Sequence, residues 1–225
     1  MLDLPGRDRP YLRRAYSVAD ADTATGEIEL LVKTVGPGTA ALADVPSGSA
    51  VSLLGPLGNG FSLEGTQRGE RVAVLAGGIG AAPFPLLFRT LARAGLEADF
   101  YLGGRNAVEL SLGERFEKIV PGRIFLATDD GTVGERGFVT DLFGRHAAQA
   151  GYVRLYACGP MPMFAALASI VARLALPSQF STEAVMGCGF GACLGCVIPG
   201  VEKPFLISCT EGPILPPEKI AWEKL

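Results

Sequence analysis

Residues 71–84 read RVAVLAGGIGAAPF, and this stretch decides the fold. RVAVLA (71–76) predicts a buried strand, GGIGAAP (77–83) predicts a tight turn, and the next residues have the apolar spacing of a helix that ends at Gly95. A near-continuous apolar strand that enters a helix through a glycine turn is typical of parallel sheets with helices on both faces.

The same alternation continues toward the C-terminus. We expect strands at 98–103, 123–128, 152–158 and 179–184, and helices at 112–119, 139–151 and 161–175. Upstream, short apolar runs at 28–35 and 50–54 are separated by the turn signals VGPGT and GPLGNG, which predicts part of an antiparallel barrel. The chain is therefore expected to be multidomain, of the α+β and α/β classes, with a doubly wound parallel sheet at its centre.

Composition and charge exclude several classes of protein. Of the 225 residues, 48% are hydrophobic and 19% are charged, which excludes a disordered chain. Twenty basic residues against 23 acidic ones give a net charge of -3, which predicts no attraction to nucleic acid or to an anionic membrane. Glycine and proline interrupt the apolar run 72–88, and the N-terminus lacks an apolar signal core, so we expect a cytoplasmic protein.

Four of the five cysteines lie near the C-terminus with the spacing C-x4-C-x2-C-x12-C: Cys188, Cys193, Cys196 and Cys209. A C-x4-C-x2-C run followed by a distant fourth cysteine is the plant-type spacing for a [2Fe–2S] cluster. Structural zinc and disulfides are the alternatives, although zinc sites usually pair two C-x2-C knuckles and only one is present. Residues 185–225 are too short and too rich in glycine and proline to build a hydrophobic core, so we expect the metal centre to hold them together.

Two glycine turns are expected at the carboxyl edge of the sheet, where open α/β sheets bind ligands. The first contains Gly77, Gly78 and Gly80, and the second contains Cys158, Gly159 and Pro160. Together they predict a nucleotide site, since glycine lets backbone N–H groups reach a phosphate. The alternative is a pair of tight turns without a ligand, because Ala82 stands where G-x-G-x-x-G has its last glycine.

A third motif is Arg14-Ala15-Tyr16-Ser17, in which a guanidinium, an aromatic ring and a hydroxyl could clamp a planar, phosphorylated cofactor. Taken alone, the motif is more typical of an exposed arginine beside a half-buried tyrosine.

In this order the motifs resemble the electron-transfer subunits of the two-component, NAD-dependent dihydroorotate dehydrogenases, within the ferredoxin–NADP reductase superfamily. The matching segments run from about residue 13 to residue 212: RAYS, VGPGT, GPLGNGF, GGIGAAP, LGGRN, ATDDGTVGERGFVTDL, ACGPMPM and CGFGACLGC. The cysteine run and GPLGNGF are the specific ones, whereas GGIG and CGP occur across the superfamily.

The resemblance implies three cofactors and their residues. FAD would be held by Arg14, Ala15, Tyr16 and Ser17, by Leu31, Val32 and Lys33 on the next strand, and by Gly38 and Thr39 at the pyrophosphate. Gly77, Gly78, Gly80, Cys158, Gly159 and Pro160 would frame NAD, and Cys188, Cys193, Cys196 and Cys209 would ligate the cluster. Arg105, after the second strand, does not by itself decide between NAD and NADP.

The resemblance also implies a partner and a route for electrons. Electrons would pass from a flavin-bearing catalytic subunit, which oxidises dihydroorotate to orotate, through the cluster and FAD to NAD+, in a heterotetramer. Flavin is needed between the two because nicotinamide exchanges hydride while the cluster passes single electrons. No residue is predicted to be catalytic, and the only histidine, His146, is expected to pack or lie on the surface. Phe190, Leu194, Val197 and Ile198 are expected at the subunit interface.

Other classes of protein remain open: a related subunit of a hydrogenase or of an NADH-dependent ferredoxin–NADP oxidoreductase, or a zinc-stabilised nucleotide-binding module. Family members carry further strands before the RxYS motif, for which this chain offers thirteen residues. We therefore expect a FAD-binding barrel shortened at its N-terminus at 1–66, an NAD-binding domain at 67–184 and a [2Fe–2S] domain at 185–225.

Overall fold

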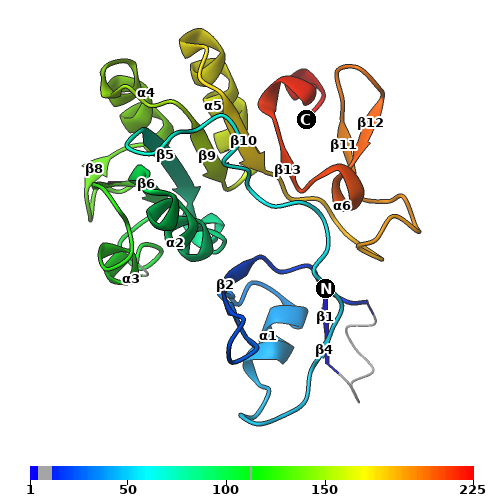
Figure 1. The fold of residues 1–225 in the computed structure, drawn as a ribbon. Coiled ribbons are helices and arrows are strands. Elements are labelled where there is room, and N and C mark those ends of the chain that lie inside the picture. Colours follow the sequence, from blue (N-terminus) through cyan, green and yellow to red (C-terminus); the bar gives the residue numbers. More distant parts are fainter. Residues whose placement is uncertain (5–11, 112) are drawn as a thin grey trace.

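A parallel sheet forms the centre of the fold in the computed structural model, which describes residues 1–4, 12–111 and 113–225 (Figure 1). Its strands are β5 (Arg71–Gly77), β6 (Glu97–Gly104), β7 (Ile124–Thr128), β8 (Glu135–Arg136), β9 (Leu155–Cys158), β10 (Ser178–Ser181) and β13 (Ile214–Leu215). They lie in the order β13-β10-β9-β5-β6-β7-β8, and each neighbouring pair is parallel except β10 with β13. The order reverses at β5, which makes the gap between β5 and β9 the switch point of the sheet.

Helices cover both faces of this sheet, as the alternation in the sequence predicts. Along β5, Val72 and Val74 pack toward α2 (Phe84–Ala94) and α3 (Gly113–Glu117), while Ala73 and Leu75 pack toward α4 (Val139–Ala150) and α5 (Met161–Leu174). A strand buried on both faces has no polar side to show, which explains the unbroken apolar run. The sheet is therefore doubly wound.

The predicted elements of this region are present, with differences at their ends. Helix α2 ends at Gly95, which adopts a left-handed conformation with φ of 73° and so closes the helix. The predicted strand 152–158 is shorter and begins at Leu155, and the strand expected at 179–184 is β10, which ends at Ser181. The helix expected at 112–119 is α3, and its first expected residue, 112, lies outside the described residues.

The N-terminal region contains two antiparallel strand pairs and a helix. Strand β1 (Leu2–Asp3) pairs with β4 (Ser52–Leu53), and β2 (Val18–Asp22) pairs with β3 (Glu27–Leu30). Within the part of the chain that the structure describes, these pairs are separate two-stranded sheets, so the partial barrel stays a prediction. The apolar run 28–35 gives a strand only as far as Leu30.

The segment VGPGT begins a helix, α1 (Pro37–Ala43), and the expectation of a simple turn there was wrong. Pro37 occupies the first turn, where its fixed φ suits a helix and its missing N–H costs nothing. Thr39 supports the start of the helix, because its hydroxyl accepts the N–H groups of Val35 and Gly36 at 2.9 and 3.2 Å.

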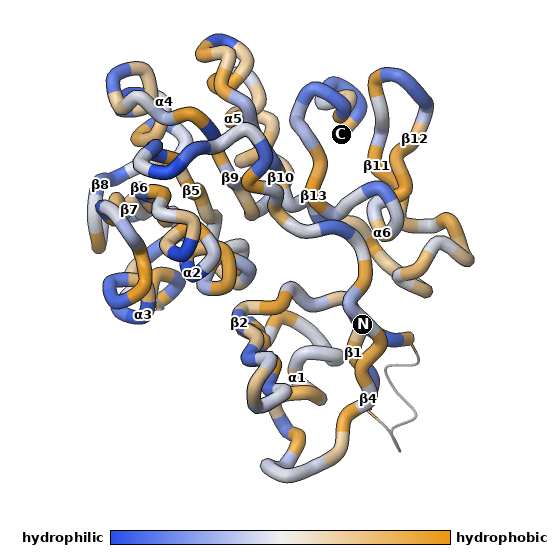
Figure 2. Tube along the Cα trace, viewed as in Figure 1, coloured by the Kyte–Doolittle hydropathy of each residue, from blue (hydrophilic) through white to orange (hydrophobic). Residues whose placement is uncertain are grey.

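The C-terminal region adds a hairpin of β11 (Val197–Pro199) and β12 (Phe205–Ile207), the short helix α6 (Ser208–Glu211), and the 3-10 turns η2 (Pro217–Lys219) and η3 (Trp222–Lys224). Figure 2 shows hydrophobic residues along both strands of the hairpin and polar residues at its tip. Ile198, Leu206, Leu215 and Ile220 are buried together, so the expectation that this region has no hydrophobic core was wrong. This small core forms because β13, which pairs with β10 of the main sheet, contributes Leu215 to it.

The connection between the N-terminal region and the sheet runs along the C-terminal region. Asn59 in GPLGNGF donates its backbone N–H to Gly212 O and its side-chain amide to Ile214 O, both at 2.8 Å. Phe61 then packs against Phe84 and Tyr156 at the edge of the sheet.

None of the described helices is both long enough and apolar enough to span a bilayer.

Candidate functional site

The two predicted glycine turns meet at the switch point of the sheet. Strand β5 ends at Gly77 and continues into the 3-10 turn η1 (Gly78–Ala81), while β9 ends at Cys158. Ala76 and Cys158 are partners in the parallel register, so the turns that follow them lie side by side. Parallel sheets bind ligands beyond this edge at such a point.

Close packing between the turns explains their glycines. A Cβ on Gly80 would overlap the carbonyl group of Cys158 and lie 2.9 Å from the Cα of Gly159. A Cβ on Gly77 would lie 2.8 Å from Cδ of Pro160. Gly78 has φ of 54°, a left-handed conformation that glycine adopts without cost. Gly80 and Gly77 are thus required by close approach and Gly78 by conformation.

Cys158 is held as a neutral thiol. It is buried, and its burial raises the pKa of the thiol to about 12, while a hydrogen bond with Ser181 on the adjacent strand acts in the opposite direction. A thiol with so high a pKa is a poor nucleophile at neutral pH. Cys158 therefore acts as a buried packing residue at the carboxyl edge of the sheet.

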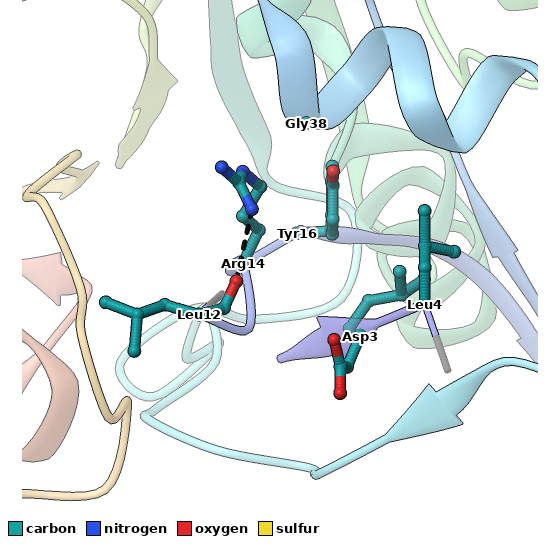
Figure 3. A pocket seen from close by; sticks show the side chains of 7 residues that line it. Asp3, Leu4, Leu12, Arg14, Tyr16 and Gly38 are labelled. Carbon is teal, nitrogen blue, oxygen red and sulfur yellow. Dashed lines mark hydrogen bonds between the residues drawn. The ribbon is translucent and has the colours of Figure 1, made fainter. Parts of the chain in front are cut away.

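Arg14 and Tyr16 line a small hollow at the base of α1, as Figure 3 shows. Both side chains point toward the helix end that carries Gly38. A Cβ on Gly38 would overlap the guanidinium of Arg14, so glycine is required for this approach. Among the described residues, the Arg14 guanidinium donates to Leu12 O at 3.1 Å, and the side chain lines the hollow. The guanidinium can thus serve a phosphate oxygen, which fits the predicted role.

The remaining predicted FAD residues fall into two groups. Ala15 and Ser17 are exposed next to Arg14 and Tyr16 on the same segment. Leu31, Val32 and Lys33 follow directly after β3 rather than lying on a strand, so the expectation of a strand there was wrong. Thr39 already binds the N-terminal backbone of α1, which is a structural role for its hydroxyl.

Glu109 joins the two predicted nucleotide sites, and the sequence reasoning missed it. Its Oε1 accepts from Lys33 Nζ at 2.8 Å and from Arg105 Nε at 2.8 Å, and its Oε2 accepts the backbone N–H of Arg105 at 3.0 Å. These bonds, with those of Arg105 first, lower the pKa of Glu109 to about 2. The spacing of four residues from Arg105 was the available signal, but Lys33 is 76 residues away in sequence.

The four clustered cysteines come together through backbone contacts. The N–H groups of Gly191, Cys193 and Cys209 donate to the sulfurs of Cys209, Cys188 and Cys196 at 3.2, 3.4 and 3.3 Å. Gly189 and Gly191 have φ of 82° and 86°, which turns these amides inward. N–H donors from Cys193 and Phe190 lower the pKa of Cys188 to about 6, toward the thiolate form that binds metal.

This donor set fits an iron–sulfur cluster. All four are thiols, and the sulfurs of Cys188, Cys196 and Cys209 receive backbone N–H groups, which stabilise sulfur that carries negative charge. Across residues 1–4, 12–111 and 113–225, no three Cys, His, Asp or Glu side chains converge on one point as ligands of a single metal ion do. Ligands shared between two irons need not converge in that way.

The loop of residues 188–196, called the cluster loop below, has an apolar outer surface with the adjoining Val197 and lies against Met1. Phe190, Leu194 and Val197 are 56%, 60% and 43% exposed. Ile198 belongs to the small C-terminal core, so its expected place at an interface was wrong. A Cβ on Gly189 would lie 2.6 Å from Cγ of Met1, which brings the loop into contact with the region of the predicted FAD site.

His146 lies on α4, far from these sites along the sheet. Its ring packs 5.0 Å from that of Phe125 and 6.1 Å from that of Tyr101, between centroids. It is therefore a packing residue.

Comparisons with known proteins give a consistent result. Residues 183–221 match the family model of the iron–sulfur cluster binding domain of dihydroorotate dehydrogenase B, and residues 1–61 match the oxidoreductase FAD-binding domain. The chain is 37% identical over 218 residues to the electron transfer subunit of dihydroorotate dehydrogenase B (NAD(+)) from Desulforamulus reducens, which covers 95% of this chain and 82% of that protein. It is 39% identical to the same subunit from Bacillus caldolyticus, over 91% and 78% of the two chains.

Solved structures share the architecture. A chain of an NADH-dependent reduced ferredoxin–NADP oxidoreductase superposes with a TM-score of 0.82 at 26% identity, over 93% of this chain and 74% of that one. A ferredoxin reductase of carbazole 1,9a-dioxygenase superposes with a TM-score of 0.58 at 21% identity, over 74% and 54% of the chains, a likeness of fold alone.

Proposed function

Since this chain belongs to the family of electron transfer subunits of dihydroorotate dehydrogenase B (NAD(+)), we propose that it carries electrons from a flavin-bearing catalytic subunit, which oxidises dihydroorotate to orotate, to NAD+. The observation that carries the proposal is the loop of residues 188–196 with Cys209, which brings four thiols together and directs backbone N–H groups at three of them. The relatives favour this function over a subunit of another complex and over a zinc-stabilised module.

The cofactors are assigned to residues as follows. Cys188, Cys193, Cys196 and Cys209 hold a [2Fe–2S] cluster; Arg14, Ala15, Tyr16, Ser17, Leu31, Val32, Lys33, Gly38 and Thr39 border FAD; Gly77, Gly78, Gly80, Cys158, Gly159 and Pro160 border NAD. When bound, FAD and the cluster supply the conversion between hydride transfer and single-electron transfer. The guanidinium of Arg14 beside Gly38 and the adjoining turns at the switch point support the two nucleotide sites.

The protein's own residues bind and position the cofactors, and none acts as a general base. The amides of the cluster loop stabilise charge on sulfur, and the turns at the ends of β5 and β9, which pack against each other, would offer backbone N–H groups to the dinucleotide. Cys158 stays protonated at neutral pH because it is buried. Hydride transfer between two ring systems needs orientation rather than proton transfer, which fits this set of residues.

We assign three domains: a FAD-binding barrel at 1–66, an NAD-binding α/β domain at 67–184, and a [2Fe–2S] domain at 185–225. The ranges of the two family models, 1–61 and 183–221, support the outer boundaries. A cytoplasmic location fits the five cysteines, none of which is paired in a disulfide, as is usual in a reducing compartment.

The cluster assignment is tested by metal and sulfide content with the visible spectrum of protein purified without oxygen. We expect iron and acid-labile sulfide, and we expect Cys193→Ser to lose the cluster absorption while the flavin bands remain. Cys158→Ser, which changes the buried cysteine outside the cluster loop, is the matched control and should keep its iron. Zinc in place of iron, or an unchanged spectrum in Cys193→Ser, would contradict the assignment.

The partner is proposed to dock on the exposed apolar surface of the cluster loop, formed by Phe190, Leu194 and Val197, in a heterotetramer. Apolar side chains gathered around a redox centre favour a protein partner that covers them. Phe190→Asp should abolish co-purification with the catalytic subunit. Phe138→Asp, at a phenylalanine that is 66% exposed at the start of α4, should leave co-purification intact. Equal yields of complex from both variants would place the partner elsewhere.

A further inference from the structure

Glu109 lies at the carboxyl edge of the sheet, beside the first glycine turn. Strand β6 pairs with β5 so that Gly103 is opposite Gly77, and Glu109 follows the end of β6 by five residues. A Cβ on Gly78 would lie 3.9 Å from Oε2 of Glu109, which places this carboxylate against the turn. In doubly wound sheets, the end of the second strand is where the ribose 2′ position of a dinucleotide is recognised.

Both cations near this position are already bound to the same carboxylate. The Nε and Nη2 atoms of Arg105 lie 2.8 and 2.5 Å from Oε1 of Glu109, and Lys33 Nζ lies 2.8 Å from it. An arginine whose fork is occupied by a carboxylate has fewer donors for a phosphate. Asp129, at the end of β7, also faces Arg105 and adds negative charge. The edge therefore offers no surplus positive charge to a 2′-phosphate.

Oε2 of Glu109 distinguishes a hydroxyl from a phosphate. It accepts one hydrogen bond, from the backbone N–H of Arg105 at 3.0 Å, and keeps capacity for another donor. A ribose hydroxyl can donate to it, whereas a phosphate oxygen brings like charge and has no proton to give. The side chain of Glu109 is only 13% exposed, so water screens this repulsion weakly.

We propose that Glu109 determines the preference of this protein for a dinucleotide with a free 2′-hydroxyl, because it accepts that hydroxyl and holds Arg105 and Lys33 in ion pairs. The role rests on the proposed function, since it concerns the same NAD site. Removing the charge of Glu109 frees both cations, which then attract a 2′-phosphate. Glu109 is thus a specificity-determining residue, because its ion pair with Arg105 keeps that guanidinium from binding a 2′-phosphate.

The test compares NAD+ with NADP+, which differ by that one phosphate, in calorimetric titrations of the full chain with its cofactors at low salt. In Glu109→Gln, we expect affinity for NADP+ relative to NAD+ to rise about tenfold, the usual effect of one charge-assisted hydrogen bond gained or lost. Adding Arg105→Gln to this variant should remove the gain. Glu114→Gln, an exposed carboxylate of α3, changes the net charge equally and should leave the ratio unchanged.

An unchanged ratio in folded Glu109→Gln protein would overturn the proposal, as would a wild-type chain that binds NADP+ as tightly as NAD+. If Glu109→Gln does not fold, Glu109→Asp replaces it: the shorter carboxylate cannot reach both cations, and a smaller shift toward NADP+ is expected, so a constant ratio there also overturns the proposal. A wild-type chain that binds neither nucleotide would contradict the proposed function itself, and this role with it.

Discussion

At the switch point of the sheet, Gly80 sits where the backbones of two loops touch. An alanine there would push its Cβ into the carbonyl of Cys158, and backbone atoms cannot move aside as a side chain can. We expect Gly80→Ala to lower the free energy of unfolding by about 1–3 kcal/mol, the usual cost of overpacking. Chemical denaturation measures the loss. Gly113→Ala, whose added Cβ meets nothing within 4 Å, is the control and should unfold like the wild type.

Glu109 should make stability depend on pH in the acid range. Its pKa in the folded protein, about 2, lies below its ordinary value of 4.5, so its contribution is fully present above about pH 4.5 and is lost as the pH falls toward about 2. We therefore expect Glu109→Gln to be less stable than the wild type at pH 7 and equally stable near pH 2, by thermal unfolding. A stability difference that does not shrink on acidification would show that the carboxylate is not held as an ion by Lys33 and Arg105.

Sequence spacing can predict a site residue when its partners lie close to it along the chain. The spacing from Cys188 to Cys196 predicts the cluster loop, because ligands of one centre on one loop must keep a fixed separation. Glu109 could not be found in this way, since its partner Lys33 comes from another region of the chain. Ile198 was expected at an interface because it is apolar, yet alternation along β11 turns it inward while Val197 faces outward.

At the scale of elements, the segment GPLGNGF (residues 55–61) is hydrogen-bonded to the C-terminal region. Asn59 accepts the N–H of Ile214 at 2.9 Å and donates to the carbonyl of the same residue, which aligns β13 with the sheet. We expect Asn59→Ala to cost about 1 kcal/mol, since these bonds are exposed, and to speed hydrogen exchange of the Ile214 amide. Gln67→Ala, another exposed amide in the same connection, is the control. Unchanged exchange at Ile214 in Asn59→Ala would mean that β13 is held by the sheet alone.

Most elements of the sheet could be predicted because local signals and tertiary packing agree there. Apolar runs predict β5 and β6, and glycines in left-handed conformations end α2 and α4 at the expected places. Helix α1 was missed because glycine and proline usually indicate turns, whereas here Pro37 and Thr39 stabilise a helix start. The pairing of β13 with β10 was also beyond prediction, since it depends on contacts more than thirty residues apart.

At the scale of the whole molecule, ion pairs join the N-terminal region to the sheet. Asp20 pairs with Arg89 at 2.7 Å, Glu29 with Arg115 at 2.5 Å, and Lys33 with Glu109 at 2.8 Å. In each pair one residue follows or belongs to the β2–β3 hairpin and the other belongs to the sheet region, and Figure 1 shows that hairpin next to α2. Such a contact should be sensitive to salt, whereas the apolar core under the helices should not.

We therefore expect 1 M NaCl to speed hydrogen exchange in residues 18–30 several-fold relative to 0.1 M, while exchange in β5 and β9 stays constant. The screening length falls from about 10 Å to about 3 Å over this range, and a half-exposed pair contributes about 0.2–1 kcal/mol. The double variant Asp20→Asn, Glu29→Gln should exchange rapidly at both salt concentrations, because it lacks two of the pairs. Equal protection of the hairpin in 0.1 M and 1 M salt would mean that apolar contacts such as the fully buried Ala19 hold it, and that the ion pairs add little.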